Sequence, residues 1–120
     1  MHKTVLIVED YDDTRSLMRF LLEDLHYEVE EASNGQEAVQ KVKYNFPDLI
    51  LMDMSMPVMD GLTATKIIRK FDGAARLPII AVTAFGKSYY RQAIEAGCDD
   101  LINKPVDLTV LKSILDQYLS

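Results

Sequence analysis

Polar residues that could do chemistry follow four short apolar runs of the sequence: Glu9 and Asp10, Asp53, Thr83, and Lys104. If these runs are parallel strands, the residues stand where ligands bind, because an open parallel sheet binds ligands beyond the carboxyl ends of its strands. Two or three carboxylates, a hydroxyl and an ammonium would then surround one shallow crevice. The pattern predicts a site assembled from segments that lie far apart in the sequence.

Carboxylates crowded at one crevice need a cation to offset their repulsion. Two full charges ~4 Å apart cost about 4 kcal/mol at an effective dielectric constant of about 20. Lys104 supplies one positive charge, whereas a divalent ion supplies two, and hard oxygen ligands suit Mg²⁺. A carboxylate beside such an ion can attack phosphorus, while the ion, an ammonium and a hydroxyl take up charge on the phosphoryl oxygens. We therefore expect a Mg²⁺ site with Asp53 as the nucleophile.

Each of these residues, taken singly, has a commoner explanation. An acidic residue at a strand end is often solvated or caps the next helix, and Asp12 and Asp13 have the positions of first-turn residues favoured by the helix dipole. A lone Thr83 is more often an ordinary strand-end hydroxyl, and a lone Lys104 a surface charge. Only their joint occurrence at the ends of adjacent strands points to a site.

The elements that must position these residues alternate between short apolar runs and longer amphipathic segments. Runs 5–8, 49–52 and 79–82 are almost continuously apolar, as strands covered by helices on both faces must be, so we expect them at the centre of a sheet. Residues 28–30 alternate polar with apolar, and 99–102 are apolar at one end only, so both are expected at the sheet edges. Right-handed βαβ crossovers then predict a doubly wound α/β fold with a five-stranded parallel sheet and five helices.

Five amphipathic segments predict helices with one buried stripe each. The stripes are Leu17, Met18, Leu21, Leu22 and Leu25; Ala38, Val39 and Val42; Leu62, Ile67, Ile68 and Phe71; Tyr90, Ala93 and Ile94; and Leu108, Leu111, Ile114, Leu115 and Tyr118. Asn34, three residues before Glu37, and Asp107 have the positions of helix N-caps.

Composition excludes several classes of protein. The chain has 120 residues with 13 Lys+Arg and 19 Asp+Glu, a net charge of −6. This is typical of one domain that binds cations or proteins rather than nucleic acid or an anionic membrane. No segment reaches the ~18 apolar residues of a membrane span, so a cytoplasmic location is expected. Cys98 is expected to be a buried structural thiol, and His2 and His26 are expected on the surface. Neither a Gly-rich nucleotide-binding motif nor Cys-x-x-Cys occurs.

In combination, these motifs resemble the receiver domain of two-component response regulators over essentially all of residues 1–120. Residues 5–10 resemble the first strand of that family with its acidic pair, and 49–61 (LILMDMSMPVMDG) resemble its phosphoacceptor strand and loop. Residues 81–84 (AVTA) and 103–105 (NKP) complete the set. The resemblance implies a flavodoxin-like sheet with strand order 2-1-3-4-5, an order that the sequence pattern alone does not provide.

The same resemblance implies a role for each acidic residue. Asp53 would accept a phosphoryl group from a phosphohistidine on a sensor histidine kinase or a histidine phosphotransfer protein. Asp10 and Asp53 would bind Mg²⁺ through carboxylate oxygens. Glu9 would act nearby or through water, and Ser55 would contribute its backbone carbonyl. The chain would thus be modified by a partner and would need Mg²⁺ for the transfer.

The resemblance also implies how the phosphoryl group is held and how its presence is read. Thr83 and Lys104 would contact phosphoryl oxygens, with a cis bond between Lys104 and Pro105 aiming the lysine. In the family, the threonine is drawn to the phosphoryl group and an aromatic residue on the fifth strand turns inward. This change remodels the face of the fourth helix, fifth strand and fifth helix, where a downstream protein target would dock. Leu101 stands at the aromatic position, so we expect the readout to rely on the loop after Thr83.

Three aromatic residues follow Thr83 closely in the sequence. We expect Phe85 to screen the site and to affect how fast water removes the phosphoryl group. Tyr89 and Tyr90 open the fourth predicted helix, where one is expected to pack on the sheet and the other to contact a partner, because exposed Tyr is enriched at interfaces.

Two other functions are compatible with the pattern. One is a receiver fold that binds a partner but has lost phosphotransfer. The other is a small phosphatase of the haloacid dehalogenase type, although that family has a second Asp where this chain has Ser55. A receiver would assist only its own phosphorylation and dephosphorylation and would not be an enzyme with a separate substrate. Because no output domain follows the fifth predicted helix, we expect a stand-alone regulator, with a piece of a longer protein as the alternative.

Overall fold

Every predicted apolar run forms a strand in the computed structural model, which describes residues 2–120. The strands are β1 (Thr4–Val8), β2 (Glu28–Ala32), β3 (Leu49–Asp53), β4 (Ile79–Thr83) and β5 (Asp100–Asn103). They pair in parallel in the order β2-β1-β3-β4-β5. The predicted fold class, strand order, central strands and edge strands are therefore confirmed.

Five α-helices and two short 3₁₀ segments connect the strands. They are α1 (Asp12–Asp24), α2 (Gly35–Tyr44), α3 (Gly61–Arg69), η1 (Ala74–Arg76), η2 (Gly86–Tyr89), α4 (Tyr90–Ala96) and α5 (Leu108–Leu119). The predicted caps are confirmed: Asn34 Oδ1 accepts a hydrogen bond from the Glu37 amide at 2.9 Å, and Asp107 Oδ1 accepts one from the Thr109 amide at 2.7 Å. Such caps satisfy amides that have no partner within the first helical turn.

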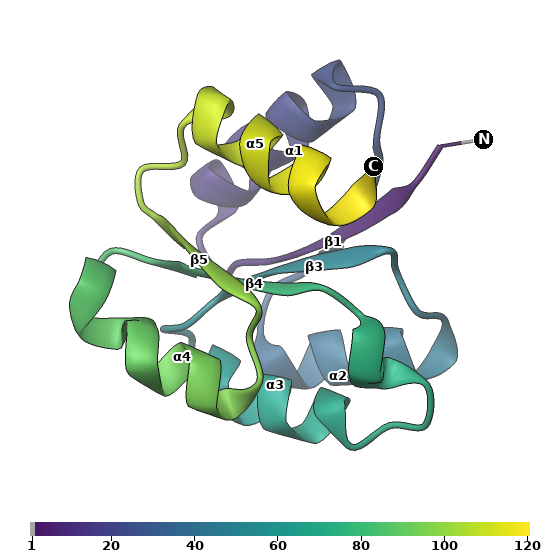
Figure 1. The fold of residues 1–120 in the computed structure, drawn as a ribbon, viewed down its shortest axis with the longest axis vertical. Helices are drawn as coiled ribbons and strands as arrows, with labels where there is room; N and C mark the ends of the chain where they lie inside the picture. The colour runs from purple at the N-terminus through teal and green to yellow at the C-terminus, as the bar shows by residue number, and fades with distance from the viewer. Residues whose placement is uncertain (1) are drawn as a thin grey trace.

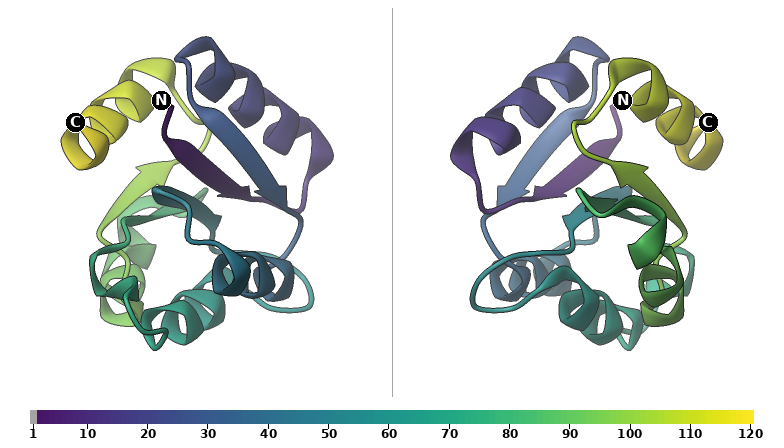
Figure 2. Two further views of the ribbon diagram at one scale, coloured as in Figure 1. Left: turned by 90° about the vertical axis from the view of Figure 1, so that its right-hand side faces the viewer. Right: turned by 90° about the vertical axis from the view of Figure 1, so that its left-hand side faces the viewer.

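The helices cover both faces of the sheet, with α1 and α5 on one side and α2, α3 and α4 on the other (Figure 1). Figure 2 shows the same two layers from either side, with the twisted strands between them. Along β1, Val5 and Ile7 pack in the core beneath α1 and α5, while Leu6 and Val8 pack in the core on the opposite face. Both alternating sets are buried, which is why the central strands are continuously apolar.

Four residues of the predicted stripes are exposed instead of buried: Leu17, Tyr90, Ile94 and Leu108. The prediction was least accurate for α4, where the buried residues are Ala93 and Ala96. These small side chains let a short helix lie close to its neighbours. Tyr90 and Ile94, four residues apart, share the outer face of the helix.

The remaining predictions about isolated residues are confirmed. Cys98 is buried, and burial raises the pKa of its thiol to about 11. His2 and His26 are exposed. Among residues 2–120, no helix combines the length and the apolar character that crossing a membrane requires.

Candidate functional site

Three of the predicted site residues meet beyond the carboxyl ends of the strands. The Lys104 Nζ lies 2.8 Å from Glu9 Oε1 and 3.3 Å from Asp53 Oδ2. Glu9 follows β1 and Asp53 ends β3, which are adjacent strands, whereas Lys104 follows β5. Glu9 and Asp53 are only 1% and 4% exposed, so the ammonium neutralises charge in a nearly closed space.

The backbone around Asp53 depends on a glycine at the start of α3. A Cβ at Gly61 would lie 2.2 Å from the Asp53 carbonyl oxygen, so only glycine allows the first turn of α3 to approach β3 this closely. Within the intervening loop, the Ser55 amide donates a hydrogen bond to Asp53 Oδ1 at 3.2 Å. On the opposite side of the site, the bond between Lys104 and Pro105 is cis, as the family resemblance implies.

The pKa values of the two buried carboxylates are shifted in opposite directions by burial and by neighbouring charges. Burial, reinforced by the negative charge of Glu9, raises the pKa of Asp53 to about 6, although the Ser55 amide and Lys104 oppose the rise. Burial also acts to raise the pKa of Glu9, but Lys104 and the Tyr11 amide outweigh it and leave that pKa below its usual value. At neutral pH, two carboxylates therefore share one ammonium, and the cluster keeps an excess of negative charge.

The excess negative charge fits a divalent cation. Glu9, Asp10 and Asp53 each present a carboxylate oxygen, and these oxygens all lie within 4.8 Å of one another. Asp10 is exposed and stands on the solvent side of the cluster. The buried Glu9 Oε1 accepts no aligned hydrogen bond from the described part of the chain, although Lys104 is its ion-pair partner. Three hard oxygen ligands open to solvent on one side suit Mg²⁺, which retains several waters.

The two predicted hydroxyl residues differ in position. Thr83 is 1% exposed, and its Oγ1 accepts a hydrogen bond from the Phe85 amide at 3.1 Å, so the hydroxyl is tied to the loop that follows β4. Ser55 is exposed in the loop after β3. The predicted contact of Thr83 with a phosphoryl oxygen and the role of the Ser55 carbonyl stay predictions.

Of the two tyrosines predicted to open the fourth helix, only Tyr90 does so, because Tyr89 ends the preceding segment η2. Tyr89 packs against the core on the α4 face together with Leu101, while Tyr90 is half exposed. The ring of Phe85 is 60% exposed and stacks on Tyr89 with their centroids 6.1 Å apart. The expected packing of one tyrosine is confirmed, whereas the docking role of the other and the screening role of Phe85 stay predictions.

Sequence reasoning missed three residues that touch the site: Tyr11, through its amide, Gly61, through its close approach to Asp53, and Arg15, through its side chain. Nη1 of Arg15 donates a hydrogen bond to the Glu9 carbonyl oxygen at 2.8 Å. The sequence holds only a weak signal for this contact, the spacing of Asp12 and Arg15 that suits an ion pair within one helical turn. Beside the site, an apolar hollow of about 390 Å³ is lined by Thr14, Leu17, Met18, Ala84, Lys104, Pro105 and Val106.

Residues 5–116 match the sequence model of a protein family, the response regulator receiver domain. The chain belongs to this family of two-component signalling domains. The chemotaxis protein CheY of Halobacterium salinarum is 42% identical over 106 residues, which cover 88% of this chain and 87% of that protein. The chain also matches hybrid signal transduction histidine kinase G of Dictyostelium discoideum at 43% identity, covering 95% of this chain but 3% of the kinase. The resemblance seen in the motifs is thus confirmed.

Two similar solved structures contain a magnesium ion in one case and a phosphotransfer protein in the other. A receiver domain of a sensor histidine kinase from Pseudomonas aeruginosa, with magnesium coordinated in its active site cleft, superposes with a TM-score of 0.92 at 33% identity over 98% of both chains. The receiver domain of the response regulator Ssk1 from Saccharomyces cerevisiae, crystallised with the histidine phosphotransfer protein Ypd1, matches with a TM-score of 0.90 at 34% identity over 98% of this chain and 88% of that chain.

Proposed function

We propose that residues 1–120 act as one receiver domain and as a phosphorylation-dependent switch in a two-component system or phosphorelay. In this proposal, Asp53 accepts a phosphoryl group from a histidine kinase or a phosphotransfer protein in a Mg²⁺-dependent reaction, and a protein partner reads the changed surface. The observation that carries the proposal is the meeting of Glu9, Asp53 and Lys104 in one pocket with Asp10 beside it. The chain assists its own modification and has no separate substrate.

The transfer step follows from the charges of the site. A carboxylate oxygen of Asp53 forms a bond to phosphorus while the phosphorus–nitrogen bond of the donor phosphohistidine breaks, and the imidazole nitrogen keeps the electron pair and takes up a proton. With a pKa of about 6, Asp53 is mostly ionised at neutral pH and can act as the nucleophile. Lys104, already 3.3 Å from Asp53, is close enough to contact an oxygen of the transferred group. Bound by Glu9, Asp10 and Asp53, Mg²⁺ would neutralise charge on the phosphoryl oxygens.

The readout begins at Thr83. A phosphoryl group adds about −1.5 to −2 charge and three acceptor oxygens, one of which could accept a hydrogen bond from the Thr83 hydroxyl and draw it toward Asp53. A movement of that hydroxyl would break its hydrogen bond from the Phe85 amide and release the loop after β4. That loop leads through η2 into α4, so its movement would change the face formed by α4, β5 and α5. The downstream partner is proposed to bind that face, with half-exposed Tyr90 as one contact.

The phosphoryl donor must approach from the open side of the site. The apolar hollow beside Lys104 and the exposed side chain of Leu17 on α1 offer a surface there that suits the apolar core of a protein interface. The complex of Ypd1 with the Ssk1 receiver domain supports a phosphotransfer protein as one class of partner. The expected cytoplasmic location stays a prediction.

Phosphorylation by a small donor tests the proposal directly. Wild-type protein, Asp53→Asn and the control Asp72→Asn, whose aspartate is exposed and far along the chain from the site, are incubated with acetyl phosphate and analysed by intact mass. We expect one phosphoryl group on wild type and control, none on Asp53→Asn, and none on any variant when Mg²⁺ is chelated. A mass gain that persists in Asp53→Asn would identify a different acceptor. Wild type that binds Mg²⁺ but gains no mass would favour the alternative of a binding module without phosphotransfer.

A further inference from the structure

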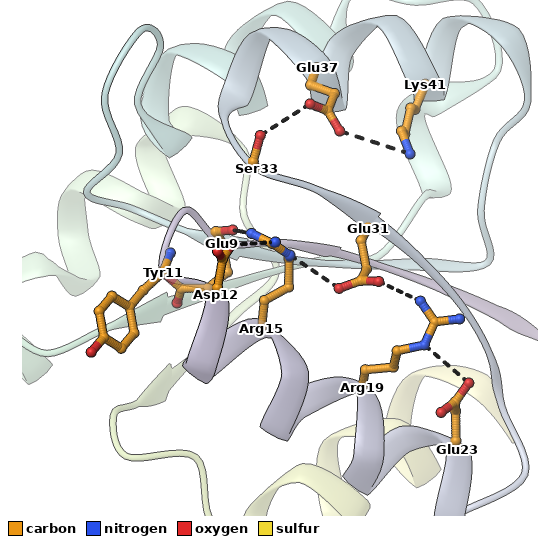
Figure 3. A network of polar contacts seen from close by, with 10 residues as sticks. All are labelled: Glu9, Tyr11, Asp12, Arg15, Arg19, Glu23, Glu31, Ser33, Glu37 and Lys41. Carbon is orange, nitrogen blue, oxygen red and sulfur yellow. Dashed lines mark hydrogen bonds and ion pairs between the residues drawn. The ribbon is translucent and has the colours of Figure 1, made fainter.

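Arg15 joins three parts of the molecule beside the acidic pocket. From α1, its Nη1 donates to the Glu9 carbonyl at 2.8 Å, its Nη2 donates to Asp12 Oδ1 at 2.6 Å and its Nε donates to Glu31 Oε1 at 3.1 Å. Figure 3 shows the guanidinium between these three oxygens. The Arg15 side chain is 19% exposed, so most of it is shielded from competing water.

Glu31, the anchor on β2, is held by a second arginine. One oxygen of Glu31 accepts from Arg15, and the other contacts Nη1 of Arg19, whose Nε donates to Glu23 at 3.2 Å (Figure 3). Within residues 2–120, Arg19 makes no hydrogen bond to Glu9. The two arginines therefore share Glu31 but differ in their contact with the site.

The contact of Arg15 matters because Glu9 and Asp10 are consecutive yet have opposite environments. Glu9 is buried and Asp10 is exposed, while both present an oxygen near Asp53. The peptide group that joins them carries the Glu9 carbonyl, so its orientation determines where Asp10 points. The Glu9 amide donates to the Ala32 carbonyl at 3.0 Å, and the Glu9 carbonyl is held by Arg15. Without Arg15, that carbonyl would be free to turn, and repulsion among the carboxylates would favour movement of Asp10 away from the pocket.

We propose that Arg15 is a positioning residue of the Mg²⁺ site, which holds the Glu9–Asp10 peptide so that both carboxylates face the ion. The inference rests on the proposed function, since the Mg²⁺ site is part of it. A positive charge near a cation site acts in the opposite direction, because it repels the ion. If Arg15 acts by positioning the carboxylates, its replacement should weaken Mg²⁺ binding. If it acts only through its positive charge, replacement with a neutral residue should strengthen Mg²⁺ binding.

Substitution with lysine separates geometry from charge, because lysine keeps the charge but lacks the planar fork of donors. Mg²⁺ affinity is measured by isothermal titration calorimetry on the full chain as wild type, Arg15→Lys, Arg15→Met and Arg19→Lys. Outer residues that orient metal ligands typically change affinity by 10–100-fold, so we expect both Arg15 variants to bind Mg²⁺ about tenfold more weakly. Arg19→Lys, the matched control, is expected to stay within about twofold of wild type.

A second readout distinguishes positioning from general destabilisation. Thermal unfolding without Mg²⁺ should show a loss for both Arg15→Lys and Arg19→Lys, because both weaken a link to Glu31, and a larger loss for Arg15→Lys, which also loses the contact with the Glu9 carbonyl. Both variants should remain folded at the temperature of the titration. In phosphorylation by acetyl phosphate, Arg15→Lys should need about tenfold more Mg²⁺ for half-maximal rate while approaching the wild-type maximum.

Several outcomes would overturn the inference. If Arg15→Lys binds Mg²⁺ with wild-type affinity, the planar guanidinium is not needed. If Arg15→Met binds Mg²⁺ more tightly than wild type, only the charge of Arg15 acts. An equal loss in Arg15→Lys and Arg19→Lys would assign the effect to Glu31 and the stability of β2. If any of these occurs while wild type is phosphorylated at Asp53, the inference fails alone. If wild type binds no Mg²⁺, the proposed function fails together with it.

Discussion

The two ends of the sheet both hold ion pairs, but the charges balance at only one of them. At the amino ends of β4 and β5, Arg69 donates to the carbonyls of Ala74, Leu77 and Gly97 and to the carboxylate of Asp99, at 2.6 to 2.9 Å. The charges of one arginine and one aspartate balance there, and Nε, Nη1 and Nη2 of the Arg69 guanidinium each donate to at least one acceptor. The charges of Arg69 and Asp99 are therefore paired with each other.

At the carboxyl ends of the strands, the charges do not balance. Glu9, Asp10 and Asp53 lie close together, the single ammonium of Lys104 pairs with Glu9 and Asp53, and burial raises the pKa of Asp53 to about 6. The comparison teaches that an ion pair partly shielded from water is not by itself a sign of a binding site. What distinguishes the carboxyl end is an excess of one sign that an external cation can relieve.

The largest effect is expected from breaking the balanced end. Replacing Arg69 with Met leaves the Leu77 and Gly97 carbonyls without their arginine donor and Asp99 without its cation, in a region where the arginine is only 17% exposed. The Ala74 carbonyl loses the arginine but keeps the Leu77 amide as a donor. We expect a loss of about 3 kcal/mol in the free energy of unfolding, measured by urea denaturation. Arg76→Met, at an exposed position of η1, serves as the control and should cost little. A loss below about 1 kcal/mol for Arg69→Met would contradict the account of the amino end.

The opposite effect is expected at the unbalanced end. The pKa of Asp53 rises from 3.8 to about 6 on folding, so the folded, metal-free protein holds a proton there that the unfolded chain has released. The contribution of Asp53 to stability therefore falls as the pH rises from about 4 to about 6, and Asp53→Asn removes that loss. At pH 7 we expect Asp53→Asn to be more stable than wild type by about 2 kcal/mol in urea, with the difference disappearing below about pH 4. A variant less stable than wild type at pH 7 would show that Asp53 does not carry the cost of the crowded charge.

Mg²⁺ should stabilise the molecule through the carboxyl end alone. At a free Mg²⁺ concentration ten times the dissociation constant, binding adds about 1.4 kcal/mol to the free energy of unfolding, and Tm rises accordingly. Arg69→Met, although less stable, should gain the same increment because its change lies at the other end of the sheet. A smaller increment in Arg69→Met would show that the two ends are coupled.

The smallest effect concerns backbone strain in the loop after β3. Val58 has a φ of 69°, and the Met59 amide donates to the Pro57 carbonyl across it at 2.7 Å. A β-branched residue is unfavourable in this region, whereas glycine adopts it readily. We expect Val58→Gly to raise stability by about 1 kcal/mol, and Val58→Ala, which keeps a Cβ, to change it little. Equal effects of the two substitutions in urea denaturation would rule out strain as the cause.

The central strands and the meeting of Glu9, Asp53 and Lys104 could be predicted, because each of these residues follows or ends an apolar run that is recognisable in the sequence. The runs that end before Glu9 and within β3 and β4 are apolar on both faces, which only strands between two helical layers require. The stripe of α4 could not be predicted as reliably. In a helix of seven residues, Tyr90 and Ile94 satisfy the periodicity as well as Ala93 does, and close packing selected the small side chains.

The sequence by itself determined where the strands end and which residues stand there, because the apolar runs that form strands can be told apart from the amphipathic segments that form helices. Only the tertiary structure decided how the arginines pair: Arg15 binds the Glu9 carbonyl beside the acidic cluster, and Arg69 binds three carbonyls and Asp99 at the opposite end of the sheet. The physical reason is that most of the acceptors for these arginines are backbone carbonyls. Every residue carries one, so a long-range contact to it leaves no mark in the pattern of residue types.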